Sequence, residues 1–285
     1  MPYGGASMEA PAVPPHTSTG LWGPPTSSVD WCEVNYEHTR YVAELFNTVS
    51  SFAMCAVAVL GICLHRRVLE RRFILAFAVV LVVGLGSAAF HGTLRFQLQM
   101  LDELPMLYSA LVIVYILLED RPQRRFGAWF PVALVAHGLL VTALSALTRG
   151  QVQFFAFQVS FGSMEFFALY KIFRIYRRSE SRDLRRLYRV GMVSYLAALA
   201  CWITDLRACD FVSRFLPAHG LPNPQLHAWW HVLVSAGMYL LTLVMAHDRL
   251  RVLRRRPMLS FAAGLVPCVR DGGPATVRDL RAGAL

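Results

Sequence analysis

The chain has 285 residues, of which 55% are hydrophobic and only 16% are charged. This composition is too apolar for an ordinary soluble domain, and the apolar residues come in long runs. Lys and Arg (28) outnumber Asp and Glu (18). The arginines form short clusters between apolar runs, so they indicate membrane topology and do not predict a nucleic-acid-binding face.

The first segment differs from the rest of the chain. Residues 1–29 are rich in Pro, Gly, Ser and Thr and lack the continuous apolar core of a signal peptide, so we expect a flexible leader. An acidic stretch, residues 30–44, opens the main domain, residues 30–257. Its spacing fits no EF-hand, and its residues alone favour an acidic cap over a metal loop.

Seven hydrophobic runs follow, and each is close to the ~20 residues that a helix needs to cross about 30 Å of hydrocarbon. The fourth and fifth runs are separated by little more than Arg149 and Gly150, which predicts a tight helical hairpin. The predicted fold class is an all-α, seven-transmembrane helix bundle. The runs lie near residues 41–64, 73–91, 98–118, 126–147, 151–173, 187–206 and 225–247.

Arginine placement predicts the orientation of this bundle. Alternate connections, together with the segment after the last run, carry arginine clusters, whereas the opposite connections hold only Arg95, Arg149, Arg207 and Arg214. Because basic loops face the cytosol, we expect a luminal or extracellular N-terminus and a cytosolic C-terminus. Residues 258–285 are too short and interrupted for another span, and we expect a disordered cytosolic tail.

Three histidines and an aspartate fall at one predicted membrane depth. His91 ends the second run, Asp102 opens the third, and His227 and His231 open the seventh. Ionisable side chains are costly in hydrocarbon, so several at one level indicate a functional site. Histidines at i and i+4 share a helix face, about 5–6 Å apart at Cβ, and can reach one ion. His91 would complete a three-histidine set.

Three neutral imidazoles with one open position are what catalytic zinc prefers. Zinc lowers the pKa of water toward ~7 and so generates a nucleophile at neutral pH. Ser87 shares the helix face of His91 and is predicted to hydrogen-bond that water or a developing oxyanion. Asp102 is predicted to accept a proton from this water or to orient the water. His137 and His247 lie in hydrophobic runs too, but as lone histidines they favour helix packing over metal binding.

Six cysteines are too few for a disulfide scaffold in a chain of this length. Cys32 and Cys209 stand apart because both fall in polar segments on the same predicted non-cytosolic side. A disulfide between them is compatible with an oxidising lumen.

Three segments together resemble a known family. VDWCEVNYEHTRYVAELFNTVSS (29–51), GSAAFHGTLRFQLQMLDELPMLYS (86–109) and LHAWWHVL (226–233) look like the alkaline ceramidases, seven-span membrane amidases. Their superfamily also contains the adiponectin-receptor type proteins. The resemblance covers roughly residues 30–257, and the motifs occur in the family's order. The chain has MLDELPM at 100–106 where the family pattern reads LLDELPM, a trivial departure.

The resemblance implies an activity: hydrolysis of the N-acyl amide of ceramide to a sphingoid base and a free fatty acid. It implies zinc ligands at His91, His227 and His231 and catalytic roles for Ser87 and Asp102, which the spacing had already selected.

The resemblance also implies two features of the N-terminal segment. One is a disulfide between Cys32 and Cys209. The other is a structural calcium site, which is physically sensible because a hard cation takes several oxygen ligands. The implied ligands are Asp30, Trp31 through its backbone carbonyl, Glu33, Asn35 and Glu44.

Two alternative functions stay open at this point. A seven-span lipid-sensing receptor of the same superfamily would carry structural zinc, and a lipid esterase or phospholipase-like remodelling enzyme would use the same metal chemistry on an ester. The DWCExN and DELPM motifs favour the amidase. We expect ceramide and the lipid bilayer as partners, no nucleic acid, and an endoplasmic reticulum or Golgi membrane; the sequence leaves the oligomeric state open.

Overall fold

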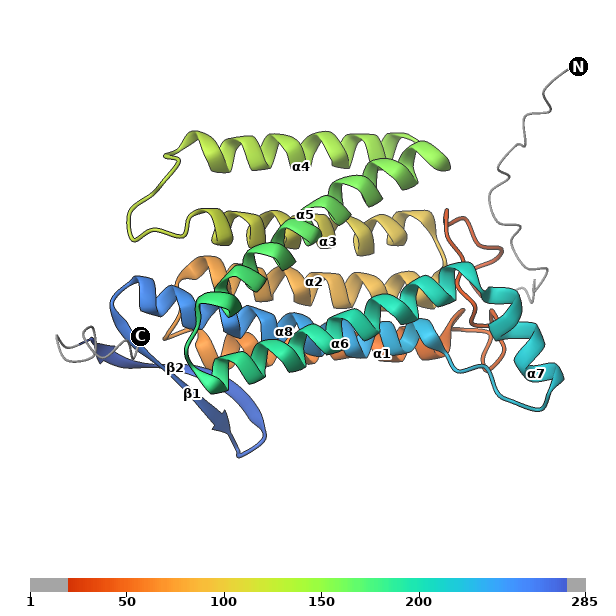
Figure 1. Cartoon of the computed structure of the whole chain (residues 1–285). Helices are drawn as coiled ribbons and strands as arrows, with labels where there is room; N and C mark the ends of the chain where they lie inside the picture. Colours follow the sequence, from red (N-terminus) through yellow and green to blue (C-terminus); the bar gives the residue numbers. More distant parts are fainter. Residues whose placement is uncertain (1–19, 276–285) are drawn as a thin grey trace, which may run out of the picture.

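The structure, a computed structural model, describes residues 20–275. Seven long helices run roughly along one axis (Figure 1), and each is long and apolar enough to cross a membrane. The predicted seven-helix bundle is therefore confirmed. The helices are α1 (Leu45–His65), α2 (Arg71–Thr93), α3 (Phe96–Leu118), α4 (Trp129–Leu147), α5 (Gln151–Arg178), α6 (Arg182–Arg207) and α8 (Leu226–Val252).

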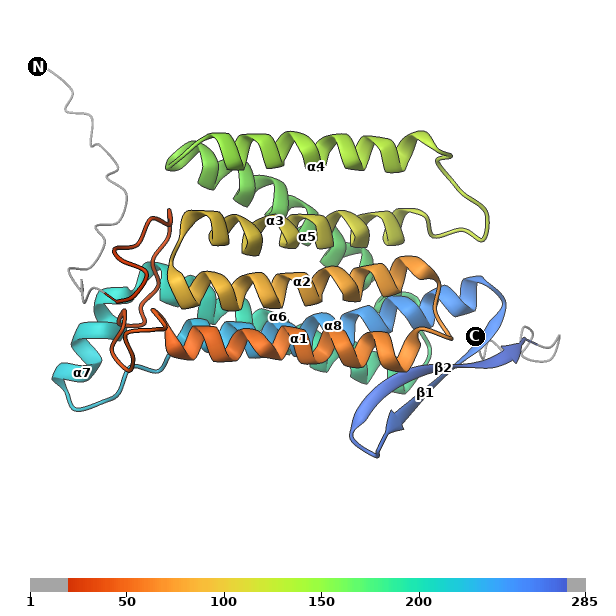
Figure 2. The same ribbon diagram turned by 180° about the vertical axis from the view of Figure 1, so that it is seen from behind.

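Helix α8 lies at the centre of the packing. More of its apolar window is buried, 56%, than that of any other span in residues 20–275, and it packs against α1, α5 and α6. Helix α4 lies at the edge beside α3 and α5 (Figure 2). Helices α6 and α8 approach closely at Gly237, where a Cβ would lie 2.9 Å from the Tyr195 backbone nitrogen. Small residues allow such contacts between membrane helices.

Three helices extend several residues beyond their hydrophobic runs. Helix α8 continues to Val252, whereas its apolar run predicted a limit near 247. Helix α5 continues to Arg178 and α6 begins at Arg182, whereas the apolar runs predicted limits near 173 and 187. Ser181 starts α6 because its hydroxyl accepts a hydrogen bond from the Leu184 backbone nitrogen at 3.3 Å. Hydropathy identifies only the membrane-embedded part of a helix, so it does not predict polar helical turns beyond the membrane.

The segment before α1 is packed on the bundle. Leu21 donates its backbone N–H to Arg40, Thr26 and Ser27 donate theirs to Leu94, and Ser28 donates to the Gln99 side chain. The expectation of a flexible leader is therefore wrong for residues 20–29, while residues 1–19 lie outside the described part. A run of Pro, Gly and Ser does not reveal such long-range backbone hydrogen bonds.

The predicted disulfide between Cys32 and Cys209 is confirmed, with Cα atoms 5.2 Å apart. It joins the N-terminal segment to the connection between α6 and α8. That connection contains the short helical segments η1 (Phe211–Phe215) and α7 (Leu216–Ala218). The Cys32 carbonyl also accepts hydrogen bonds from Ser213 (2.7 Å) and Asn223 (2.8 Å), so the two segments form one cap over the end of the bundle.

A β-hairpin follows α8, where we expected a disordered tail. Strands β1 (Arg255–Ala262) and β2 (Val266–Pro274) pair antiparallel around a turn with positive φ at Ala263 and Gly264. The hairpin packs against the bundle: Val269 donates its backbone N–H to His65, and Tyr239 donates its hydroxyl to the Pro267 carbonyl. The expectation of disorder is therefore wrong for residues 258–275. Contacts distant in sequence stabilise the hairpin, and local composition does not show them.

Hydrogen–deuterium exchange of the full chain tests this hairpin. We expect slow exchange for the backbone amides within residues 257–271 that bond across the ladder, and for that of Val269, which donates to His65, because these hydrogen bonds and the contacts with α1 and α8 protect them. The exposed residues 121–124, between α3 and α4, serve as the internal reference and exchange early. Equal exchange rates in the two segments would contradict the hairpin.

Candidate metal centre

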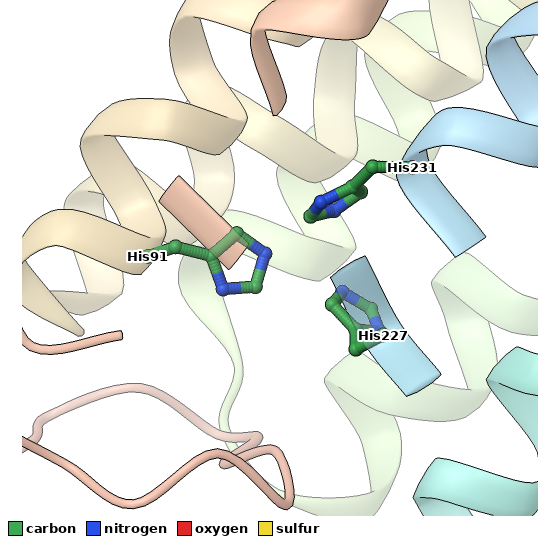
Figure 3. A group of neighbouring side chains, drawn as sticks. All are labelled: His91, His227 and His231. Carbon is green, nitrogen blue, oxygen red and sulfur yellow. The ribbon is translucent and has the colours of Figure 1, made fainter. Parts of the chain in front are cut away.

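Three buried histidines converge at the end of the bundle capped by the N-terminal segment. His91 comes from the last turn of α2, and His227 and His231 come from the first two turns of α8 (Figure 3). Their ring centroids are 5.0, 5.0 and 4.6 Å apart, and one potential ligand atom from each lies within 4.8 Å of the others. The structure thus brings the predicted set together, and it can hold a metal ion.

Two imidazole nitrogens in this group lack protein partners. Nε2 of His91 and Nδ1 of His227 are buried and accept or donate no hydrogen bond within residues 20–275. Buried polar atoms are almost always satisfied, and an unsatisfied one needs an explanation. A metal ion at the centre of the three rings supplies one.

Glu44 holds the first of these rings. Its carboxylate lies 2.5 Å from Nδ1 of His91, and its backbone N–H donates to the His91 carbonyl at 3.0 Å. A carboxylate on one imidazole nitrogen fixes the ring orientation and leaves the other nitrogen for a metal. Burial raises the pKa of Glu44 well above its usual range. The sequence placed Glu44 among the calcium ligands and did not predict this contact.

Helix α1 supplies polar partners for the site that were not predicted from the sequence. Ser50 lies 2.8 Å from Nδ1 of His231, and Ser51 donates its hydroxyl to Ser87 at 3.0 Å. Asn47 lies one turn before them and donates its side-chain amide to Glu44. These three residues have i, i+3 and i+4 spacing in an apolar run, and that polar face could have indicated a helix facing the site.

Ser87 and Asp102 lie where the prediction placed them, beside the histidines. The Ser87 hydroxyl is 3.4 Å from Nε2 of His231 and forms a hydrogen bond with the Asp102 carboxylate. Their helices cross closely because residue 86 is glycine: a Cβ there would lie 2.1 Å from the Leu101 carbonyl oxygen. This close crossing of α2 and α3 brings the serine and the aspartate together.

A cavity of about 390 Å³ extends from the histidines into the bundle. His227, His231, Ser87 and Asp102 line one part of it, and mostly apolar side chains of α1, α2, α3, α5, α6 and α8 line the rest. Apolar cavities with a few convergent polar groups are typical of ligand sites. Its volume and apolar lining suit an alkyl chain.

The acidic segment forms a second polar cluster. Asp30, Trp31, Glu33 and Asn35 line a small cavity of about 10 Å³ together with residues 209, 210, 213 and 214. That volume is about the size of one water-sized body. Asn35 donates its side-chain amide to Asp30 at 3.2 Å, so the segment curls around this space.

The carboxylates of this cluster are poorly solvated. Burial and the nearby Glu44 carboxylate raise the pKa of Asp30 to about 7, and burial raises the pKa of Glu33. The Glu33 oxygens also accept the backbone N–H groups of Phe46 (2.7 Å) and Asn47 (2.9 Å), and so satisfy the first turn of α1. This capping contact was not predicted.

The two clusters are physically continuous. The Trp31 ring stacks on the His227 ring at a centroid distance of 3.7 Å, and the Trp31 backbone N–H donates to Glu44 at 3.4 Å. Buried Asp205, near the end of α6, accepts the backbone N–H of Cys32 at 3.1 Å and also that of His227. Sequence spacing gave no indication of a role for Asp205.

Comparison with known proteins agrees with this geometry. The family model described as Ceramidase matches residues 23–267. The chain is 35% identical over 270 residues to Alkaline ceramidase 3 of Mus musculus, covering 91% of this chain and 97% of that protein. It is 31% identical to Putative alkaline ceramidase dcd3A of Dictyostelium discoideum (78% and 86% covered) and 30% identical to Alkaline ceramidase YPC1 of Saccharomyces cerevisiae (83% and 81%). The histidine centre, the polar pair beside it and the apolar cavity thus lie in a chain that belongs to the ceramidase family.

Proposed function

We propose that this protein is an alkaline ceramidase that hydrolyses the N-acyl amide of ceramide to a sphingoid base and a free fatty acid. The observation that carries the proposal is the position of the three buried histidines, with Ser87 and Asp102, at one part of an apolar cavity inside a membrane bundle. An amide with two alkyl chains needs both a polar reaction centre and an apolar enclosure, and this site combines them.

Zinc fits the donor set. His91 and His231 each have Nδ1 engaged, by Glu44 and by Ser50, which leaves Nε2 of His91 without a protein partner in residues 20–275 and Nε2 of His231 with only the 3.4 Å contact to Ser87. Three imidazole nitrogens with an open fourth position match a catalytic zinc site. When bound, zinc supplies Lewis acidity, which polarises a carbonyl and makes water a better nucleophile near neutral pH.

Ser87 and Asp102 supply the proton chemistry. The Asp102 carboxylate accepts a proton as water attacks the amide carbonyl, and it delivers that proton to the leaving amine nitrogen. Ser87 touches both Asp102 and His231, so its hydroxyl orients the carboxylate and stabilises negative charge on the former carbonyl oxygen. The surrounding apolar wall excludes bulk water and strengthens these interactions.

The acidic segment supports a calcium site of structural role. Calcium takes several oxygen ligands, and Asp30, Trp31, Glu33 and Asn35 surround a space of single-ion size, with Glu44 bonded to Trp31. Burial disfavours the charged forms of these carboxylates, and a divalent cation would offset that cost. Because Glu44 also contacts His91, calcium would stabilise the histidine centre through one side chain.

The disulfide supports a location in which the histidine end of the bundle faces an oxidising compartment. Cys32 and Cys209 are joined at the histidine end of the bundle, and disulfides persist in oxidising compartments. This agrees with the arginine distribution, which predicts that this end faces the lumen. We therefore propose an endoplasmic reticulum or Golgi membrane with the N-terminus luminal and the hairpin cytosolic.

The enzyme accounts for more of the site than a receptor with structural zinc does. A structural metal needs ligands alone, whereas here a carboxylate and a hydroxyl in mutual contact lie beside the histidines. Proton transfer requires that arrangement. Hydrolysis of an ester would use the same residues, so the choice of amide over ester rests on the family.

Replacing His231 with Ala tests the metal centre. Metal analysis of purified wild-type protein should give about one zinc per chain, and the variant should lose both the zinc and the release of fatty acid from a fluorescent ceramide, because two imidazoles hold zinc poorly. The matched control is His219→Ala, since His219 is exposed in the connection before α8. Full zinc content in the His231 variant would contradict the assignment, and wild-type protein that releases no fatty acid with calcium present would contradict the activity.

Replacing Asp102 with Asn separates proton transfer from metal binding. We expect kcat to fall about 10²- to 10⁴-fold while zinc content stays near one per chain, because Asn cannot accept the proton. Asp183→Asn, at an exposed position in the first turn of α6, is the control and keeps kcat. A kcat within a few-fold of wild type would exclude Asp102 from the reaction.

Replacing Asp30 with Asn tests the calcium site. Calcium should raise the Tm of the wild-type protein, and this increase should shrink in the variant because one charged ligand is lost. Glu37→Gln alters an exposed carboxylate of the same segment and should retain the full increase. A calcium-dependent Tm shift of equal size in both variants would show that Asp30 is no ligand.

A further inference from the structure

A second polar pair lies inside the cavity, away from the histidines. Tyr195 of α6 donates its hydroxyl to Oε2 of Glu165 on α5 at 2.6 Å. Both residues line the same cavity as His227 and His231, and the proposed reaction uses neither of them. An ionisable side chain within a membrane bundle indicates a function unless its partners explain it.

The pair lies deeper in the bundle than the metal centre. The Tyr195 backbone is level with Gly237, because a Cβ at Gly237 would lie 2.9 Å from the Tyr195 nitrogen. Gly237 follows His231 by six residues on α8, which corresponds to about 9 Å along the helix axis, toward the hairpin. If the amide of a substrate lies at the histidines, the part of its alkyl chain at this depth is several carbon atoms away from the amide.

The hydrogen bond between the two helices satisfies only one of the two carboxylate oxygens of Glu165. The hydrogen bond from Tyr195 satisfies Oε2 of Glu165, whereas Oε1 has no hydrogen bond to any residue from 20 to 275. Glu165 is partly exposed, and the cavity it lines is otherwise mostly apolar. An acceptor that faces such a space is costly without a donor. The pair therefore presents an acceptor to whatever fills the cavity.

We propose that Glu165 and Tyr195 form a binding site for a hydroxyl group carried on an alkyl chain of the substrate, several carbons from the amide. A hydroxyl is the donor that a neutral lipid chain can carry at low cost, whereas an ammonium would require a charge to enter hydrocarbon. The protein would then select ceramides with a mid-chain hydroxyl. This inference rests on the proposed function, because that function places the chain in the cavity.

Matched ceramides test the inference. The probes carry no added hydroxyl, or one next to the amide carbonyl, at mid-acyl chain, or at mid-sphingoid chain. Wild-type protein should hydrolyse one mid-chain probe with a kcat/KM about tenfold above the unsubstituted ceramide, mainly through KM, because one buried hydrogen bond is gained. Equal kcat/KM for all four probes would overturn the inference.

Two variants locate this preference. In Glu165→Leu the ratio of kcat/KM between the preferred probe and the unsubstituted ceramide should fall to about one, and Tyr195→Phe should lower the same ratio because the carboxylate loses its orienting donor. Tyr188→Phe changes a tyrosine of the same helix that does not line the cavity, and it should keep the ratio. A ratio unchanged in both Glu165→Leu and Tyr195→Phe would also overturn the inference.

A binding measurement separates this inference from the proposed function. The product that carries the hydroxyl of the preferred probe, a mid-chain hydroxy fatty acid or a mid-chain hydroxy sphingoid base, should raise the Tm of wild-type protein more than its unsubstituted counterpart does. This difference should vanish in Glu165→Leu. If that holds while no ceramide is hydrolysed, the ceramidase proposal fails and the hydroxyl site stands. If ceramide is hydrolysed but neither Tm nor kcat/KM distinguishes the hydroxylated lipids, the hydroxyl site fails alone.

Discussion

The contact between Glu44 and His91 connects every part of the site. A carboxylate with no exposure to solvent binds one nitrogen of an imidazole whose other nitrogen faces two more histidines. The same carboxylate accepts the backbone N–H of Trp31, and its own backbone N–H bonds the last turn of α2. Displacing Glu44 would therefore disturb the acidic segment, the start of α1 and the histidine centre together.

Burying so many ionisable groups in an apolar bundle is costly, and the fold meets this cost by local pairing. The three histidines of the site gather at one end of the bundle with Glu33, Glu44 and Asp205, where the segment before α1 and the segment after α6 cover them and a disulfide joins these two segments. Each buried acid has a backbone or side-chain partner, as Glu33 does at the first turn of α1. At the opposite end the hairpin closes the bundle through His65 and Tyr239.

Predictions from the sequence succeeded where one strong physical effect decides the structure by itself. Hydrophobic length located seven spans to within a few residues, except at the polar ends of α5, α6 and α8. Helical spacing placed His227 and His231 on one face, and the shared depth of His91 predicted the third member of the set. Predictions failed where contacts between distant residues decide the structure, as in residues 20–29 and in the hairpin. Local composition does not reveal such contacts.

The amino-acid pattern was sufficient for the bundle, the histidine set, the paired cysteines and the neighbourhood of Ser87 and Asp102. The bundle and the polar residues of the site follow from the cost of burying particular groups in hydrocarbon, which a single sequence shows. The cysteine pair follows from the shared predicted side of the membrane and from the family resemblance. The role of Glu44, the polar face of α1 and the meeting of Glu165 with Tyr195 required the folded arrangement. These contacts join different segments, and which residues meet depends on how closely neighbouring helices pack, as the glycine contacts at residues 86 and 237 show.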